Sequence, residues 1–221
     1  MKPVIKIDIV SDVVCPWCYI GKRRIEKAMK ALSGEFEFDV NYLPFELNPQ
    51  MPKEGLIQKE YLSKKFGSEE KYNQIIDRVK GVAAEEGLHF DFIKQKISPN
   101  TNDAHRLIWF AKKEGNQLEV KEALMKAYFE EGIDLSKKEN LIAVASSAGL
   151  DAARAALFLD SEEGVAEVSA LQALNHQRGI SGVPFYIINN QHGISGAQPS
   201  DVFVQVLKEA MGREATSVAS I

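Results

Sequence analysis

The most informative stretch of the chain is VIKIDIVSDVVCPWC, residues 4–18, which ends on the pair Cys15 and Cys18. Residues 4–10 are almost continuously apolar, which is typical of a strand in the centre of a sheet. A short loop follows, and residues 19–32 then carry apolar side chains at helical spacing. Pro16 suits the first turn of that helix, where a missing N–H costs nothing. The sequence therefore predicts that both cysteines lie where a strand passes into a helix.

The rest of the chain divides into a second strand, a long helical region and a final hairpin. Residues 36–42 alternate apolar and polar side chains, which predicts a half-buried strand at a sheet edge and, with the first strand and helix, a right-handed βαβ unit. Residues 183–188 and 193–196 predict a hairpin, and a last helix follows. Between these parts the pattern is almost wholly helical, with helices expected near residues 118–131, 137–148, 151–159 and 162–177.

This order predicts an α/β fold, βαβ–ββα, with a large all-helical domain inserted between the second and third strands. We expect residues 1–52 and 179–221 to form the α/β domain and residues 53–178 to form the insert. A chain of 221 residues with 45% hydrophobic residues is long enough to bury such a core.

Charge and hydropathy argue against several classes of partner. The formal net charge of −4 gives no electrostatic reason to expect nucleic acid, and no apolar run is long enough to span a membrane. Met1-Lys2-Pro3 leads directly into the first strand without a signal peptide, so we expect a cytoplasmic protein. We expect it to be a monomer or a homodimer.

In the cytoplasm, a Cys-x-x-Cys pair is more often catalytic or metal-binding than structural. A structural zinc site usually needs four ligands, but the chain has only two cysteines and four scattered histidines. The sequence therefore predicts neither a metal site nor a bound cofactor.

The helix start suggests a redox role for both thiols. Cys15 would face the positive end of the helix dipole, which should lower its pKa and make it the nucleophile. Cys18, one turn later, would then be the resolving thiol. Pro16 and Trp17 would modulate the thiolate, and Trp17 could also contact a substrate. The alternative is that the cysteines are inert packing residues or half of a metal site, and that Trp17 only packs.

These motifs resemble those of a known family. The Cys-Pro-Trp-Cys helix and a later Gly-Val-Pro before a hairpin resemble the thioredoxin fold, and the helical insert resembles its DsbA branch. The segments Ser11–Lys22, Asn100–Arg106 and Gly182–Tyr186 are similar to the FrnE-like DsbA family, over residues 4–211. The resemblance implies a thiol–disulfide oxidoreductase, with isomerase activity as a further option. Its substrates would be protein or small thiols and disulfides, with glutathione as a candidate co-substrate.

The same resemblance implies that a cis peptide bond precedes Pro184 and that this bond lies against the cysteines. A cis bond would leave the backbone of Val183 free to pair with an extended substrate. The alternative is a trans proline that opens an edge strand.

Three further polar residues have two interpretations each. His105 could line a cleft over the thiols and bind substrate, but a solvated or capping pair with Arg106 is the interpretation we favour. Asp8 could accept a proton from Cys18, although its parity with Lys6 suggests that the two share a less apolar face. Asp12 is expected to be a loop or capping residue.

Two other functions stay open. One is a glutathione-dependent isomerase or transferase, which resembles 2-hydroxychromene-2-carboxylate isomerase and the kappa-class transferases; that resemblance implies a serine where Cys15 stands. The other is a chaperone-like binding module that uses the cleft between core and insert.

Overall fold

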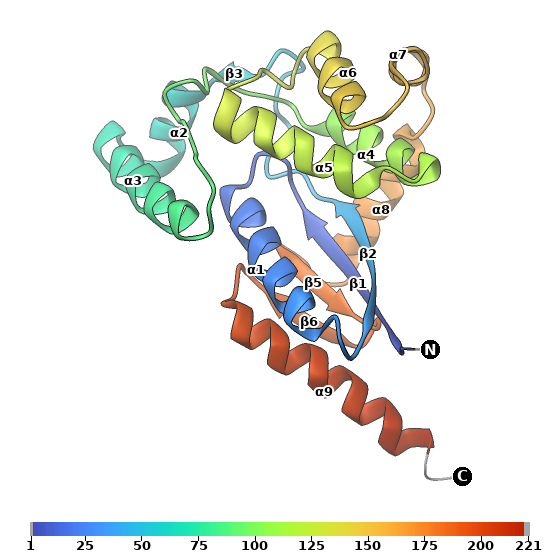
Figure 1. Ribbon diagram of the computed structural model, residues 1–221. Helices are drawn as coiled ribbons and strands as arrows, with labels where there is room; N and C mark the ends of the chain where they lie inside the picture. The colour runs from blue at the N-terminus through green and yellow to red at the C-terminus, as the bar shows by residue number, and fades with distance from the viewer. Residues whose placement is uncertain (1, 219–221) are drawn as a thin grey trace.

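The structure, a computed structural model, describes the backbone of residues 2–218 and the side chains of residues 2–211. Its main sheet has four strands in the order β2-β1-β5-β6 (Figure 1). The strands are β1 (Val4–Ser11), β2 (Glu37–Pro44), β5 (Phe185–Ile188) and β6 (His192–Ser195). β1 pairs in parallel with β2 and antiparallel with β5, and β5 pairs antiparallel with β6. The central place of the first strand and the edge place of the second are as predicted.

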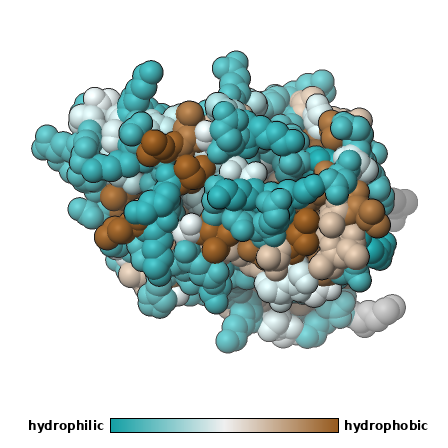
Figure 2. Space-filling view, turned by 90° about the horizontal axis from the view of Figure 1, so that it is seen from above, coloured by the Kyte–Doolittle hydropathy of each residue, from teal (hydrophilic) through white to brown (hydrophobic). Residues whose placement is uncertain are grey.

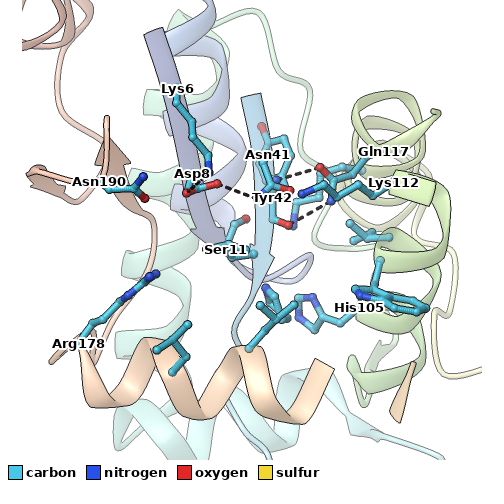
Figure 3. A pocket seen from close by; sticks show the side chains of 17 residues that line it. Lys6, Asp8, Ser11, Asn41, Tyr42, His105, Lys112, Gln117, Arg178 and Asn190 are labelled. Carbon is cyan, nitrogen blue, oxygen red and sulfur yellow. Dashed lines mark hydrogen bonds and ion pairs between the residues drawn. The ribbon is translucent and has the colours of Figure 1, made fainter. Parts of the chain in front are cut away.

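Helices cover both faces of this sheet. Ile5, Ile7 and Ile9 project from β1 with at most 3% exposure, on the face that α1 (Pro16–Leu32) and α9 (Ser200–Val218) cover side by side (Figure 1). Lys6 and Asp8 point from the opposite face, towards α8 (Val165–Gln177) (Figure 3). Because side chains alternate along β1, the strand presents an apolar face to α1 and α9 and a more polar face to α8.

The predicted insert is present and mostly helical. Its elements are β3 (Leu56–Ile57), α2 (Gln58–Phe66), α3 (Glu69–Glu85), β4 (Ile97–Ser98), α4 (Asn102–Glu114), α5 (Gln117–Lys126), a π-helical turn (Ala127–Glu131), α6 (Lys138–Ser147), α7 (Ala152–Asp160) and α8. The fold is therefore the predicted thioredoxin-like fold with a helical insertion.

Two details of the insert differ from the prediction. β3 and β4 form a small antiparallel sheet inside a region expected to be helical. Each strand has two residues, too few to show an alternating pattern in the sequence. The helix expected over residues 118–131 changes to π-helical hydrogen bonding after Lys126.

Core and insert share a hydrophobic cluster and several polar contacts. The Gln117 side chain accepts from the Tyr42 N–H at 3.0 Å and donates to the Tyr42 carbonyl at 3.1 Å, so it pairs with the free edge of β2. Glu122 of α5 reaches α1, where it lies 2.6 Å from the Lys22 ammonium and accepts from the Tyr19 hydroxyl at 2.7 Å. The domain limits at residues 52/53 and 178/179 stay a prediction, and residues 1 and 219–221 lie outside the described residues.

The surface over the insert is mainly hydrophilic, with separate hydrophobic patches (Figure 2). Among the described residues, no helix combines the length and the apolar character that crossing a lipid bilayer requires.

Candidate functional site: a buried dithiol between the sheet and the insert

The two cysteines meet at the start of α1, as predicted. Cys15 is the N-cap residue, with extended backbone angles of φ −89° and ψ 112°, and Pro16 follows in the first turn. The Cys18 N–H donates to the Cys15 carbonyl at 3.0 Å, and the two cysteines approach to 3.4 Å as free thiols. They are 4% and 3% exposed. This spacing suits a dithiol that can close to a disulfide.

The loop before β5 lies against the first cysteine. The Val183–Pro184 peptide bond is cis, and the Cys15 Sγ lies 3.6 Å from the Val183 carbonyl oxygen. Both the cis bond and its place beside the thiols are as expected. Gly21 makes the close packing of α1 against this loop feasible, because a Cβ there would lie 2.2 Å from the Tyr186 hydroxyl and 3.3 Å from Pro184 Cγ.

Pro16 and Trp17, between the thiols, are both half-buried, and Trp17 packs against the main hydrophobic cluster. Their modulating roles stay predictions.

Asp12 is a buried carboxylate rather than an ordinary loop residue. Its side chain is 1% exposed, accepts from the Leu47 N–H at 2.8 Å and faces His105, with 3.3 Å between Oδ1 and Nε2. Burial raises the pKa of Asp12, but His105, the Leu47 N–H and the charge of Lys121 outweigh that effect, so the pKa is lowered. Asp12 therefore carries a negative charge close to the cysteines.

Lys121 is a buried charge near the thiols that sequence reasoning missed. It projects from α5, is 1% exposed, and has its ammonium 5.4 Å from the centre of the Tyr42 ring. Burial lowers its pKa to about 8, although the negative charges of Cys18, Asp12 and Cys15 favour the ammonium and raise that pKa. One signal was available: Val120, Leu124 and Met125 are helical neighbours of Lys121 on the buried side.

The acidity of the dithiol differs from the prediction. The hydrogen bond to Cys18, burial and the negative charge of Asp12 hold the pKa of Cys15 well above its ordinary value. Burial also raises the pKa of Cys18, but the hydrogen bond from Cys15, Lys121 and the Ser11 hydroxyl outweigh it, so that pKa is lowered. The expectation that the helix start lowers the pKa of Cys15 is therefore wrong for the free dithiol. The positive charge of Lys121 favours the thiolate of Cys18.

The solvated interpretation of His105 and Arg106 is also wrong, because they are 3% and 5% exposed. His105 lies against Asp12. Arg106 donates to the carbonyls of Phe158, Ser161 and Glu163 and so caps the end of α7. These carbonyl acceptors lie 52 to 57 residues from Arg106 in the chain, so no local pattern in the sequence reveals them.

Asp8 shares a less apolar face of β1 with Lys6, which was the second of its two interpretations. It accepts from the Asn41 amide at 2.7 Å and lies 3.7 Å from the Lys6 ammonium, on the sheet face away from α1. Asp12 and Lys121, rather than Asp8, are the charged groups that act on the thiols.

A small cleft opens next to the first cysteine. It has a volume of about 70 Å³ and is lined by residues of the loop after β1, the loop after β2 and α2, among them Val14, Asn48, Met51 and Tyr61. Among residues 2–218, no group of three or more His, Cys, Asp or Glu side chains is arranged to hold a metal ion.

Comparison with known proteins gives the family. Residues 6–208 match the model of the DSBA-like thioredoxin domain. The chain belongs to the DSBA-like thioredoxin domain family. A DsbA-like protein of this kind is a disulfide oxidoreductase or isomerase-like enzyme, which agrees with the dithiol beside a cis proline.

Individual members support this assignment. The crystal structure of the probable DsbA oxidoreductase SCO1869 from Streptomyces coelicolor is 34% identical, with a TM-score of 0.87 over 94% of this chain and 90% of that one. The protein YwbO of Bacillus subtilis (strain 168) is 28% identical, over 93% of this chain and 96% of its own length.

A structure of 2-hydroxychromene-2-carboxylate isomerase shares the fold at 18% identity, with a TM-score of 0.68 over 97% of this chain and 98% of that one. The cytosolic disulfide reductase DsbM from Pseudomonas aeruginosa, solved with GSH, shares it at 13% identity, with a TM-score of 0.63 over 97% of this chain and 99% of that one.

Proposed function

We propose that the chain exchanges disulfides with thiol substrates through Cys15 and Cys18, in the manner expected of a FrnE-like DsbA protein. The contact between the Cys15 thiol and the Val183 carbonyl, beside the cis proline, carries this proposal. An extended substrate that pairs with the Val183 backbone would bring its sulfur to Cys15 rather than to Cys18.

The pKa order within the pair means that a proton transfer precedes the attack by Cys15. In the monoanion of the pair, the remaining proton is held on Cys15 in the hydrogen bond to Cys18. Transfer of that proton to Cys18 generates the Cys15 thiolate, which is the attacking species. Lys121 stabilises the negative charge of the pair in either arrangement, because it interacts with both sulfurs.

The reaction then takes two steps. The Cys15 thiolate attacks one sulfur of a substrate disulfide, forms a mixed disulfide, and releases the other sulfur as a thiolate, which takes the proton that Cys18 holds. The resulting Cys18 thiolate attacks the Cys15 sulfur, closes the Cys15–Cys18 disulfide, and releases the second substrate sulfur as a thiolate that takes a proton from water. The substrate is reduced by two electrons and the enzyme is oxidised by two. The same steps in reverse oxidise a dithiol substrate.

We place this activity in the cytoplasm, with glutathione or protein thiols as substrates and isomerase activity as a further use of the same dithiol. The structural similarity to a cytosolic disulfide reductase solved with GSH supports glutathione as the first small thiol to test.

The test compares Cys15→Ser and Cys18→Ser with the wild-type protein. We expect wild type to reduce glutathione disulfide, Cys15→Ser to lose exchange, and Cys18→Ser to accumulate a mixed disulfide that intact-mass spectrometry detects. Thermal unfolding shows whether each variant is folded. Turnover by folded Cys15→Ser, or a mixed disulfide formed through Cys18 alone, would overturn the assignment.

An isomerase or transferase that binds glutathione without forming a disulfide is the second candidate, because its fold is shared. It would bind glutathione tightly in both Ser variants and form no mixed disulfide in either.

A further inference from the structure

A second cavity lies on the opposite side of the sheet from α1. It has a volume of about 350 Å³ and is enclosed by β1, β2, α4, the start of α5 and α8 (Figure 3). We call it the rear pocket. Its inner wall includes Asp8, Ser11, Asn41 and Lys121, all at most 8% exposed, and its mouth includes the exposed side chains of Lys112 and Arg178. Its volume suits a small molecule.

The rear pocket is positively charged on an acidic protein. Four cationic side chains line it, namely Lys6, Lys112, Lys121 and Arg178, against the single carboxylate of Asp8, a formal charge of +3. The whole chain carries −4. Lys6 pairs with Asp8, whereas Lys112 and Arg178 form no ion pair with any residue that the structure describes. A concave site with uncompensated positive charge attracts anions.

One buried polar atom on the inner wall also lacks a partner. The Asn41 Oδ1 forms no hydrogen bond with other described residues, although Asn41 is only 8% exposed and lines the pocket. Buried polar atoms normally have a partner, so this atom is a place for a ligand group. The Asn41 oxygen is an acceptor and needs a donor. The Ser11 hydroxyl also lines the pocket, but it interacts with Cys18.

We propose that the rear pocket binds a small organic anion that has a carboxylate group and, close to it, a hydroxyl or amino group. The carboxylate would be attracted by the positive charge that Lys112, Arg178 and Lys121 give to the pocket. The hydroxyl or amino group would donate to Asn41. A plain carboxylate lacks the donating group, and inorganic phosphate carries its O–H donor on the same phosphorus as its anionic oxygens rather than on a neighbouring atom.

This site would communicate with the dithiol. Ser11 and Lys121 line the pocket, and both also stabilise negative charge on Cys18. An anion next to Lys121 offsets part of its charge, so its binding should make the thiols less acidic. This coupling rests on the proposed function of the dithiol, but the ionisation of the thiols can be measured without any turnover.

The experiment measures calorimetric binding of malate, succinate and phosphate to the full chain. Malate has the hydroxyl that succinate lacks. We expect malate to bind at one site and more tightly than either other probe. Replacing the mouth residues in the double variant Lys112→Gln/Arg178→Gln should weaken malate binding by about tenfold, since two exposed charge contacts are lost. The matched control Arg78→Gln/Lys80→Gln makes the same charge change on exposed positions of α3 and should leave binding unchanged.

Absence of malate binding at millimolar concentration, equal weakening in the control variant, or tighter binding of phosphate or succinate would overturn the proposed ligand class. Thiolate absorbance followed against pH gives the second readout. Malate at a concentration close to the wild-type Kd should raise the apparent pKa of the thiols in wild type and raise it much less in the mouth variant, which is then mostly unoccupied. Malate binding without that shift would overturn the link to Cys18. Loss of disulfide exchange in other experiments would affect neither readout, so failure of the proposed function can be distinguished.

Discussion

The Asp12 carboxylate and the His105 imidazole face each other at the junction of core and insert, with 3.3 Å between Oδ1 and Nε2. Both side chains are almost completely buried. Asp12 lies in the loop that leads to the cysteines, and His105 lies on α4 of the insert. The insert therefore supplies a partner for a charge that the core places next to its thiols.

Asp12→Asn should destabilise the protein and change its response to acid. The pKa of Asp12 is lower in the folded state than its ordinary value of 3.8. A carboxyl with a lowered folded pKa contributes stability above its unfolded pKa, and that stability is lost as the pH falls through the folded pKa. We expect a loss of about 1–3 kcal/mol in the free energy of unfolding at pH 7 and a weaker pH dependence below about pH 4. Urea unfolding between pH 2 and 7 would measure both.

Asp77→Asn is the control, because Asp77 is exposed on α3. An Asp12→Asn profile identical to that of this control would show that the carboxylate contributes no stability.

Lys121→Met should make the thiols less acidic while stabilising the fold. The lost positive charge normally favours the Cys18 thiolate, so alkylation at pH 7 should slow. The folded pKa of Lys121 is about 8, below its ordinary 10.5. A buried ammonium therefore costs stability below pH 8, and the wild-type free energy of unfolding should rise by about 3 kcal/mol between pH 8 and 10.5 from this group. The variant should lack that rise.

Alkylation kinetics and urea unfolding at both ends of this pH range would test the prediction. Lys126→Met changes an exposed lysine on the same helix and should alter neither quantity. Faster alkylation of Lys121→Met would contradict the assigned role.

Glu122→Gln should weaken the contact between α1 and α5. Burial raises the pKa of Glu122, but the hydrogen bond from Arg23 and the charge of Lys22 lower it to about 2. Lys22 is 7% exposed and would lose a charged partner at 2.6 Å. We expect a loss of about 1–3 kcal/mol at pH 7 and less acid destabilisation between pH 4.5 and 2 than in wild type.

Denaturant unfolding as a function of pH would measure this loss. Glu119→Gln, an exposed change in the first turn of the same helix, is the comparison. Equal stability of the two variants would show that solvent screens the Glu122 network completely.

Gly21→Ala should destabilise the protein, although alanine favours helix. A methyl group at residue 21 would lie 2.2 Å from the Tyr186 hydroxyl, and Tyr186 is fully buried. Overpacking of this kind costs about 1–3 kcal/mol, more than the gain of about 1 kcal/mol in helix propensity. Because the methyl group also approaches Pro184, the reactivity of Cys15 should change as well.

Gly81→Ala is the matched change, because Gly81 lies in α3 with no atom within 4 Å of the added methyl group. It should raise the thermal midpoint, whereas Gly21→Ala should lower it. A higher midpoint for both variants would contradict the tight packing of α1 against the proline loop.

The sequence by itself determined the βαβ–ββα order, the helical insert and the junction that presents the cysteines. These features follow from the apolar periodicity of each segment, from Pro16 in the first helical turn and from the three-residue spacing of the cysteines. All three depend only on residues that are close together in the sequence. The cis bond before Pro184 was expected from resemblance to a family rather than from local pattern.

Only the tertiary structure decided which charges surround the thiols. Lys121 and His105 come from the insert, and they reach Asp12 and Cys18 across about a hundred residues of chain, so no local pattern relates them. The acidity of the pair consequently depends on burial and on charges brought together by folding. For this reason the helix dipole alone predicted the wrong cysteine as the more acidic one.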